Sequence, residues 1–216
     1  MKFTKLDEAL YQYLLDHCTP VDDIVHDLVA ETSKLGTVSA MQVALDQAAL
    51  LTLLTRIRGA RQAVEVGTFT GLSALAIARG LAPDGHLLCC DVSEEWTAIA
   101  HRTWERAGVA DRITLRIAPA IETLRGLPAD FSIDIAFIDA DKTGYRDYYE
   151  EILVRMPAGG IVLLDNVLWM GSVIDPTRND ADTRAIRAFN DFIATDDRVD
   201  CVMLPVSDGL TLAVKR

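Results

Sequence analysis

The stretch Glu65-Val66-Gly67-Thr68-Phe69-Thr70-Gly71-Leu72-Ser73 decides the fold. It follows a short apolar run and leads into an apolar segment, which is typical of a strand, a tight turn and a helix. Gly67 and Gly71 permit a close backbone approach, and a helix beginning near Gly71 offers unpaired N–H groups. The spacing differs from the Gly-x-Gly-x-x-Gly turn of dinucleotide sites, and Glu65 would repel a pyrophosphate while suiting a cationic ligand. A purely structural turn is the alternative.

The segments after residue 61 alternate between short apolar runs and helical stretches. Such alternation is typical of parallel strands covered on both faces. The apolar runs are 63–66, 86–90, 113–117, 133–138 and 161–164. Two more, 201–205 and 210–214, flank Val-Ser-Asp-Gly, which indicates a hairpin. The sequence therefore predicts an α/β fold, with a doubly wound, mostly parallel, seven-stranded Rossmann-like sheet that ends in an antiparallel hairpin.

The first 60 residues indicate helices rather than strands. Leu6, Leu10, Tyr13 and Leu14 share one helical face. The stretch 41–58 is apolar on most of its circumference, which predicts a buried helix. No repeat or linker divides the chain, so we expect one domain over 1–216, with a helical extension over 1–60 and an α/β core over 61–216.

The composition disfavours several classes of protein. Lys and Arg number 21 and Asp and Glu 32, and the net charge of −11 disfavours a nucleic-acid partner. No apolar stretch is expected to reach the ~18 residues of a membrane-spanning helix, and residues 1–8 lack the apolar core of a secretory signal. The four cysteines show no metal-type spacing. We expect reduced thiols and a cytoplasmic protein without a membrane partner.

Polar residues follow the predicted strands at the edge where open sheets bind ligands. The second strand ends in Asp91, 26 residues after Glu65. A carboxylate at this place can accept hydrogen bonds from both hydroxyls of a ribose. The alternative is that Asp91 or Ser93 caps the next helix.

The fourth and fifth strands end in oxygen-bearing side chains. Asp139 follows one strand, and Asp165 and Asn166 follow its neighbour. Hard oxygen ligands without His or Cys suit Mg²⁺, Mn²⁺ or Ca²⁺ rather than Zn²⁺. Solvated strand-end carboxylates are the alternative, but two acids crowded together without a cation would repel each other.

Three motifs resemble one known family. They are Glu-Val-Gly-Thr-Phe-Thr-Gly-Leu-Ser-Ala-Leu at 65–75, Ile-Asp-Ala-Asp-Lys at 138–142 and Asp-Asn-Val-Leu-Trp-Met-Gly-Ser-Val at 165–173. With Met-Gln-Val at 41–43 and Pro-Ala at 119–120, they make the chain similar to the cation-dependent class I O-methyltransferases. This is the group of caffeoyl-CoA and catechol O-methyltransferases. The resemblance covers about residues 5–216 and implies S-adenosylmethionine as methyl donor and a divalent cation, usually Mg²⁺.

The resemblance implies a role for individual residues. Lys142 matches the catalytic base, and Asp139, Asp165 and Asn166 match the metal ligands, with Asp139 also counted as catalytic. The residues that match the donor site are Val43, Glu65, Gly67, Thr68, Ser73, Asp91, Ala120 and Asp139.

The resulting hypothesis is an enzyme that methylates one hydroxyl of a catechol-type aromatic small molecule, and the family implies a homodimer. Trp169 either covers one face of that acceptor or only packs beside it. The alternatives are O-methylation of a hydroxylated tRNA base and a non-catalytic protein that binds S-adenosylmethionine. The spacing of the glycine turn disfavours a nicotinamide dehydrogenase.

Overall fold

A seven-stranded sheet forms the centre of the computed structural model, which describes residues 4–216. Residues 1–3 lie outside the described residues. They belong to the predicted helical extension and to the first eight residues, which lack the apolar core of a secretory signal. The strand order is β3-β2-β1-β4-β5-β7-β6, with β1 to β5 parallel and β7 antiparallel to both its neighbours. The strands are β1 (Gln62–Val66), β2 (His86–Asp91), β3 (Ile113–Ile117), β4 (Ile135–Ile138), β5 (Ile161–Asp165), β6 (Val199–Leu204) and β7 (Leu210–Lys215). The predicted fold class is confirmed.

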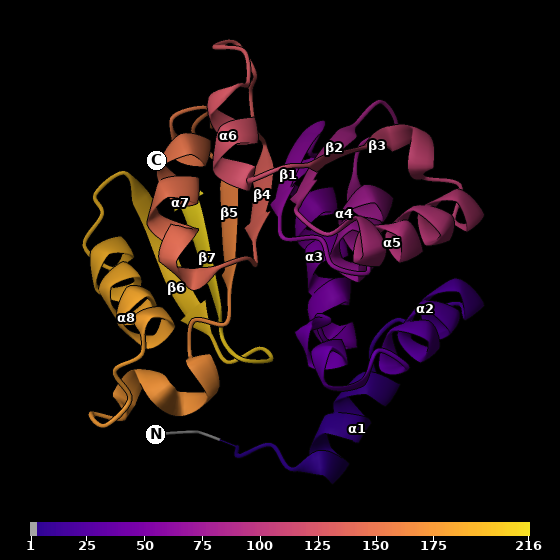
Figure 1. Cartoon of the computed structure of the whole chain (residues 1–216), viewed down its shortest axis with the longest axis horizontal. Coiled ribbons are helices and arrows are strands. Elements are labelled where there is room, and N and C mark those ends of the chain that lie inside the picture. The colour runs from indigo at the N-terminus through magenta and orange to yellow at the C-terminus, as the bar shows by residue number, and fades with distance from the viewer. Residues whose placement is uncertain (1–3) are drawn as a thin grey trace.

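Helices cover both faces of the sheet (Figure 1). One face packs against α2 (Asp23–Ser33), α3 (Leu45–Arg58), α4 (Leu72–Gly80) and α5 (Glu94–Arg106). The other packs against α6 (Ala120–Arg125), α7 (Tyr145–Leu153) and α8 (Ala181–Ile193). Short 3₁₀ segments are η1 (Gly36–Met41), η2 (Ala110–Arg112), η3 (Lys142–Gly144) and η4 (Trp169–Ile174). Neighbouring residues of β1 point to opposite clusters, Ala63 to one and Val64 to the other, as the pleat of a doubly covered strand requires.

The prediction of a buried helix over 41–58 is wrong in two respects. The helix α3 begins at Leu45, because the chain is extended at Gln42 and Ala44. Only one face of α3 is buried, and Leu53 and Ile57 are 51% and 78% exposed. The presence of apolar residues on most sides of the helix therefore did not predict which of its faces pack against other elements.

The helical segment Gly36–Arg58 meets the length and hydropathy test for a membrane-spanning helix, with a mean hydropathy of 1.3. The expectation that no apolar stretch reaches this length is wrong by that criterion. The segment is interrupted between η1 and α3, and α3 packs along α4. The helix α1 (Glu8–Asp16) buries no residue, so its predicted apolar face, including Leu10 and Tyr13, lies on the surface.

The order of the strands reverses at β1, which lies between β2 and β4. The chain leaves β1 through Gly67, at φ +88°, and passes close to the end of β4. A Cβ atom on Gly67 would lie 1.9 Å from the carbonyl oxygen of Asp139. Glycine is therefore required both by the backbone conformation and by the closeness of the two strand ends.

We expect Gly67→Ala to lower the free energy of unfolding by about 2–4 kcal/mol, through overlap with Asp139 and a strained backbone. Urea denaturation measures this loss. The matched control is Gly159→Ala, because Gly159 has φ +79° and no atom within 4 Å of the added Cβ. That control is expected to lose only ~1 kcal/mol. Equal losses in the two variants would contradict the role of Gly67 at the strand ends.

Candidate active site

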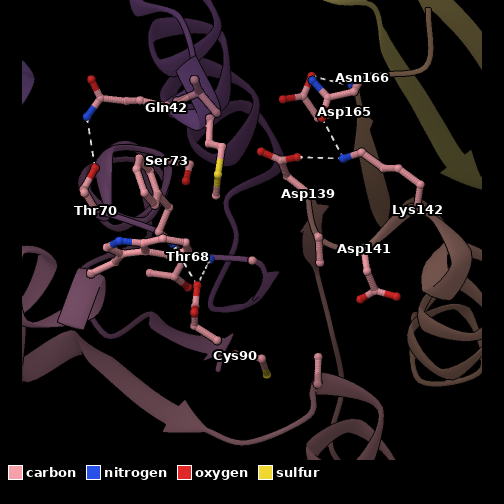
Figure 2. A pocket seen from close by; sticks show the side chains of 18 of the residues that line it. Gln42, Thr68, Thr70, Ser73, Cys90, Asp139, Asp141, Lys142, Asp165 and Asn166 are labelled. Atoms are coloured by element: carbon pink, nitrogen blue, oxygen red, sulfur yellow. Dashed lines mark hydrogen bonds and ion pairs between the residues drawn. The ribbon is translucent and has the colours of Figure 1, made fainter. Parts of the chain in front are cut away.

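A cavity of about 1060 Å³ opens beyond the carboxyl ends of β1, β2, β4 and β5. This volume is at the upper end of the range for small-molecule sites and has room for two ligands side by side. Apart from Glu65, every residue to which the sequence assigned a site role lines it: Val43, Gly67, Thr68, Ser73, Asp91, Ala120, Asp139, Lys142, Asp165 and Asn166. Figure 2 shows two groups, with Thr68, Thr70 and Gln42 apart from Asp139, Lys142, Asp165 and Asn166.

The carboxylate of Asp91 organises the glycine-containing loop. Its Oδ2 accepts hydrogen bonds from the backbone N–H groups of Thr68 and Phe69, both at 2.8 Å. Its Oδ1 accepts from Val92 N at 2.7 Å and Ser93 N at 2.8 Å. Of the two residues that the sequence offered as a cap for α5, Ser93 is the cap and Asp91 is not. Asp91 faces the cavity, and its contact with a ribose stays a prediction.

Glu65 lies behind the cavity wall rather than in it. Its side chain is fully buried, and Thr68 Oγ1 donates a hydrogen bond of 2.9 Å to its Oε2. Within the described residues its Oε1 has no hydrogen-bond partner. Burial raises the pKa of Glu65 from 4.5 to about 7. Direct contact of Glu65 with a donor stays a prediction, whereas its support of Thr68 is observed.

Lys142 joins the ends of β4 and β5. Its Nζ donates hydrogen bonds to Asp139 Oδ1 at 3.1 Å, Asn166 Oδ1 at 2.6 Å and Tyr145 Oη at 2.7 Å. Tyr145 Oη in turn donates to the backbone oxygen of Asp165 at 3.0 Å. The lysine is 7% exposed. Two of the three predicted metal ligands thus converge on one cationic group, which shows that this corner accommodates positive charge.

The carboxylates of this corner, with Asp165 buried and Asp139 half-buried, have the chemistry to hold a further cation. Burial raises the pKa of Asp139, although the positive charge of Lys142 opposes this effect. Burial raises the pKa of Asp165 as well, and the nearby charge of Asp139 adds to the increase. Asp165 is 3% exposed, and its Oδ1 accepts a hydrogen bond of 2.8 Å from the backbone N–H of Asn166. No trio of His, Cys, Asp or Glu gathers within residues 4–216, so a metal set here depends on the amide oxygen of Asn166. Two carboxylates and an amide fit Mg²⁺.

The side of the cavity near Lys142 also contains residues to which the sequence assigned no role. Asp141 lines the cavity and accepts a hydrogen bond of 2.6 Å from Tyr148 Oη. Asp208, interpreted in the sequence only as part of a turn, also lines the cavity. Beside it lie Trp169, as the sequence allowed, and Met170. The sequence could have indicated a site role for Asp141, because Asp141 is adjacent to Lys142. It could not have done so for Asp208, because Asp208 is distant in sequence from the other residues of the site.

We expect Glu65→Gln to flatten the dependence of stability on pH. Between pH 4.5 and about 7 the folded chain retains a proton on Glu65 that the unfolded chain releases, so the free energy of unfolding falls as the pH rises. The substitution removes this contribution, which amounts to about 3 kcal/mol across the window. Urea denaturation from pH 4.5 to 8 measures the free energy of unfolding of both proteins. The contributions of other buried carboxyls are the same in both and cancel in the difference.

The matched control for this prediction is Glu95→Gln, since the exposed Glu95 keeps its carboxylate in water. Its profile is expected to parallel that of the unmodified chain. Parallel profiles for Glu65→Gln as well would contradict a raised pKa at Glu65.

Comparisons with known proteins agree with this site. A model of the O-methyltransferase family matches residues 16–216. A probable caffeoyl-CoA O-methyltransferase of Dictyostelium discoideum is 39% identical over 213 residues, which are 97% of this chain and 93% of the relative. The catechol O-methyltransferase domain-containing protein 1 of Mus musculus is 36% identical over 212 residues, 97% of this chain and 80% of the relative. The crystal structure of an O-methyltransferase from Bacillus cereus in complex with SAH has a TM-score of 0.88 at 33% identity and covers 96% of this chain and 97% of that one. The resemblance inferred from the motifs is thereby confirmed, and the chain belongs to the O-methyltransferase family.

Proposed function

We propose that this protein transfers the methyl group of S-adenosylmethionine to one hydroxyl of a vicinal dihydroxy aromatic, with a divalent cation in the site. One observation carries the proposal. A single cavity joins the loop organised by Asp91 to the corner formed by Asp139, Lys142, Asp165 and Asn166. A methyl donor and an oxygen acceptor can therefore be held side by side. The SAH-bound structure from Bacillus cereus supports the donor, and the names of the curated relatives support the acceptor class.

The donor binds beside the glycine-containing loop in this proposal. Gly67 leaves room for the ligand and the adjacent strand end, and the first residues of α4 present backbone N–H groups. Asp91 accepts the ribose hydroxyls while it holds the N–H groups of Thr68 and Phe69. The same carboxylate would thus bind the donor and shape the loop around it.

Asp139, Asp165 and Asn166 would hold the cation. When bound, it lowers the pKa of an acceptor hydroxyl and orients two adjacent oxygens. The reaction is a displacement in which the acceptor oxygen bonds to the methyl carbon as the carbon–sulfur bond breaks. The chain contributes the fixed placement of both reactants and exclusion of water, since Asp165 and Lys142 are buried.

In this mechanism Lys142 acts as a neutral amine: its Nζ receives the proton of the reacting hydroxyl and becomes an ammonium. It lies within hydrogen-bond distance of Asp139 and Asn166, so it faces the same corner as the acceptor oxygens. Tyr145 fixes the lysine from behind, because the tyrosine is itself anchored to the backbone of Asp165. The base and the predicted metal ligands are therefore positioned by one hydrogen-bonded group.

A small aromatic fits the acceptor side better than a tRNA base. Trp169 and Met170 offer apolar surface at the wall next to Lys142, and the net charge of −11 opposes a polyanion. A non-catalytic binding protein would not need a lysine buried between acidic residues at the donor cavity.

We also propose a homodimer. Exposed apolar side chains lie on two of the N-terminal helices, with Leu10 and Tyr13 on α1 and Leu53 and Ile57 on α3. Association of two copies would remove such surface from water.

We expect methyl transfer to a catechol to stop in EDTA and to return with Mg²⁺ or Mn²⁺. A catechol should react at least about a hundredfold faster than the matched monophenol, because a single oxygen loses both chelation and orientation. Initial rates with labelled S-adenosylmethionine measure both effects. Calorimetric binding of the donor in EDTA is the control, since Asp91 and its loop need no metal. Full activity in EDTA, or equal rates on the two acceptors, would contradict the proposal.

We expect Lys142→Ala to lower kcat more than it raises KM, because a proton acceptor acts mainly in the reacting complex. The loss should be about 10²–10⁴-fold near neutral pH and should shrink at alkaline pH, where the hydroxyl ionises without help. Rates on one catechol from pH 7 to 10 measure this. A defect that does not change with pH would assign Lys142 to positioning instead of proton transfer.

A further inference from the structure

The segment after β5 contains bulky residues in an unfavourable backbone conformation. Trp169 has φ +48° and Met170 φ +52°, both in the left-handed region. Asn166 shares this region, but asparagine tolerates it more readily than large side chains. Such strain persists only where the surrounding structure enforces it, and it is concentrated at functional sites. An interaction from outside the segment must therefore hold the turn at 169–170.

The turn between β6 and β7 provides that interaction. Met170 N donates a hydrogen bond of 2.7 Å to Asp208 Oδ1. Leu168 N donates to the backbone oxygen of Asp208 at 2.9 Å. The contact is close, because a Cβ atom on Gly209, at φ +86°, would lie 2.5 Å from Leu168 Cγ. The two turns are thus packed directly against each other.

The flanks of the segment are held separately, by α8. Asn190 Nδ2 donates to the backbone oxygen of Val167 at 2.8 Å. Arg187 donates to the backbone oxygens of Ser172 at 2.6 Å and Val173 at 2.9 Å. Within residues 4–216, the backbone N–H of Met170 donates its hydrogen bond to the carboxylate of Asp208. The strained centre of the segment therefore depends on Asp208 rather than on α8.

This strained turn forms the cavity wall beside the catalytic lysine. Lys142 Nζ lies 5.5 Å from the centre of the Trp169 ring. Trp169, Met170 and Asp208 all line the cavity. Met170 is 87% exposed, so its own side chain packing does not fix the turn. The placement of the Trp169 ring beside Lys142 therefore depends on the backbone of 168–170 together with the packing of the ring against the buried cluster on this face of the sheet.

We propose that Asp208 is a positioning residue that clamps the Trp169–Met170 turn and thereby sets the affinity of the site for its methyl acceptor. The clamp itself is independent of the reaction; only the assignment of this wall to an aromatic acceptor rests on the proposed function. Asp208 acts through a hydrogen bond to backbone, so an amide oxygen at the same position should replace it. The matched pair of variants is therefore Asp208→Ala, which removes the acceptor, and Asp208→Asn, which keeps it.

The first experiment observes the ring without any substrate. The chain has three tryptophans, Trp96, Trp104 and Trp169, so incorporation of 5-fluorotryptophan gives three ¹⁹F resonances, and Trp169→Phe assigns one. Asp208→Ala should shift or broaden the Trp169 resonance and leave that of the core residue Trp104 in place. Asp208→Asn should retain the original position. An unchanged Trp169 resonance in Asp208→Ala would overturn the clamp.

The second experiment measures catechol methylation. Asp208→Ala should raise the KM for the acceptor about tenfold while kcat changes less than about threefold, and Asp208→Asn should stay within about twofold of the unmodified enzyme. Calorimetric affinity for S-adenosylmethionine should not change. The control is Asp175→Ala, which removes the carboxylate that accepts from Thr177 N, at 2.9 Å, at the far end of the segment.

The outcomes separate the two hypotheses. An acceptor KM raised equally by Asp175→Ala and Asp208→Ala would show general loosening of the segment and overturn the specific clamp. A shifted Trp169 resonance with an unchanged KM would overturn the link to acceptor affinity. If no catechol is methylated by the unmodified chain, the proposed function fails, while the ¹⁹F result still decides whether Asp208 holds the turn.

Discussion

The close approach of the ends of β1 and β4 is the constraint on which the rest of the site depends. Gly67 lies so near the carbonyl of Asp139 that no side chain fits between them. The strand order reverses at this point, so the loop after β1 and the segment after β4 diverge from it to opposite sides of one cavity. The first carries the backbone N–H groups bound by Asp91, and the second carries Asp139 and Lys142. The absence of a side chain at Gly67 thus allows the loop held by Asp91 to lie beside the segment that carries Asp139 and Lys142.

Burial of charge makes this site costly for stability. Glu65, Lys142 and Asp165 are buried, and only some of their polar atoms have partners within the described structure. The hydrogen bonds of Lys142 to Asp139 and Asn166 offset part of the desolvation of this corner, but Asp165 has no such cationic partner within hydrogen-bond distance. A group of acids that stays short of positive charge after folding is better explained by binding a cation than by stabilising the fold.

The sequence predicted the strands and their polar ends because both are local properties. Period and length identify a buried strand, and residues at its carboxyl end must lie at the sheet edge, as Asp139 directly after β4 and Asp165 at the end of β5 do. It did not predict which side of α3 lacks a neighbour, since apolarity does not report contacts. It did not predict the hydrogen bond from Thr68 to the buried Glu65, because burial of a strand-end carboxylate depends on residues distant in the sequence. The bond between Met170 and Asp208 spans 38 positions, so no local pattern could indicate it.

The two walls of the cavity are held in different ways, and this difference bears on specificity. The donor wall is fixed by backbone N–H groups that converge on one carboxylate, so most side chains of that loop can change without altering its path. The wall that we assign to the acceptor depends on individual side chains, namely Asp208 on the strained turn and Arg187 and Asn190 on its flanks. We expect a substitution of Asp208 to move Trp169 relative to Lys142 while leaving the donor loop intact, because Asp208 contacts the strained turn and not that loop. On the proposed assignment of the two walls, a donor site fixed by backbone contacts lies beside an acceptor site that we expect single substitutions to reshape.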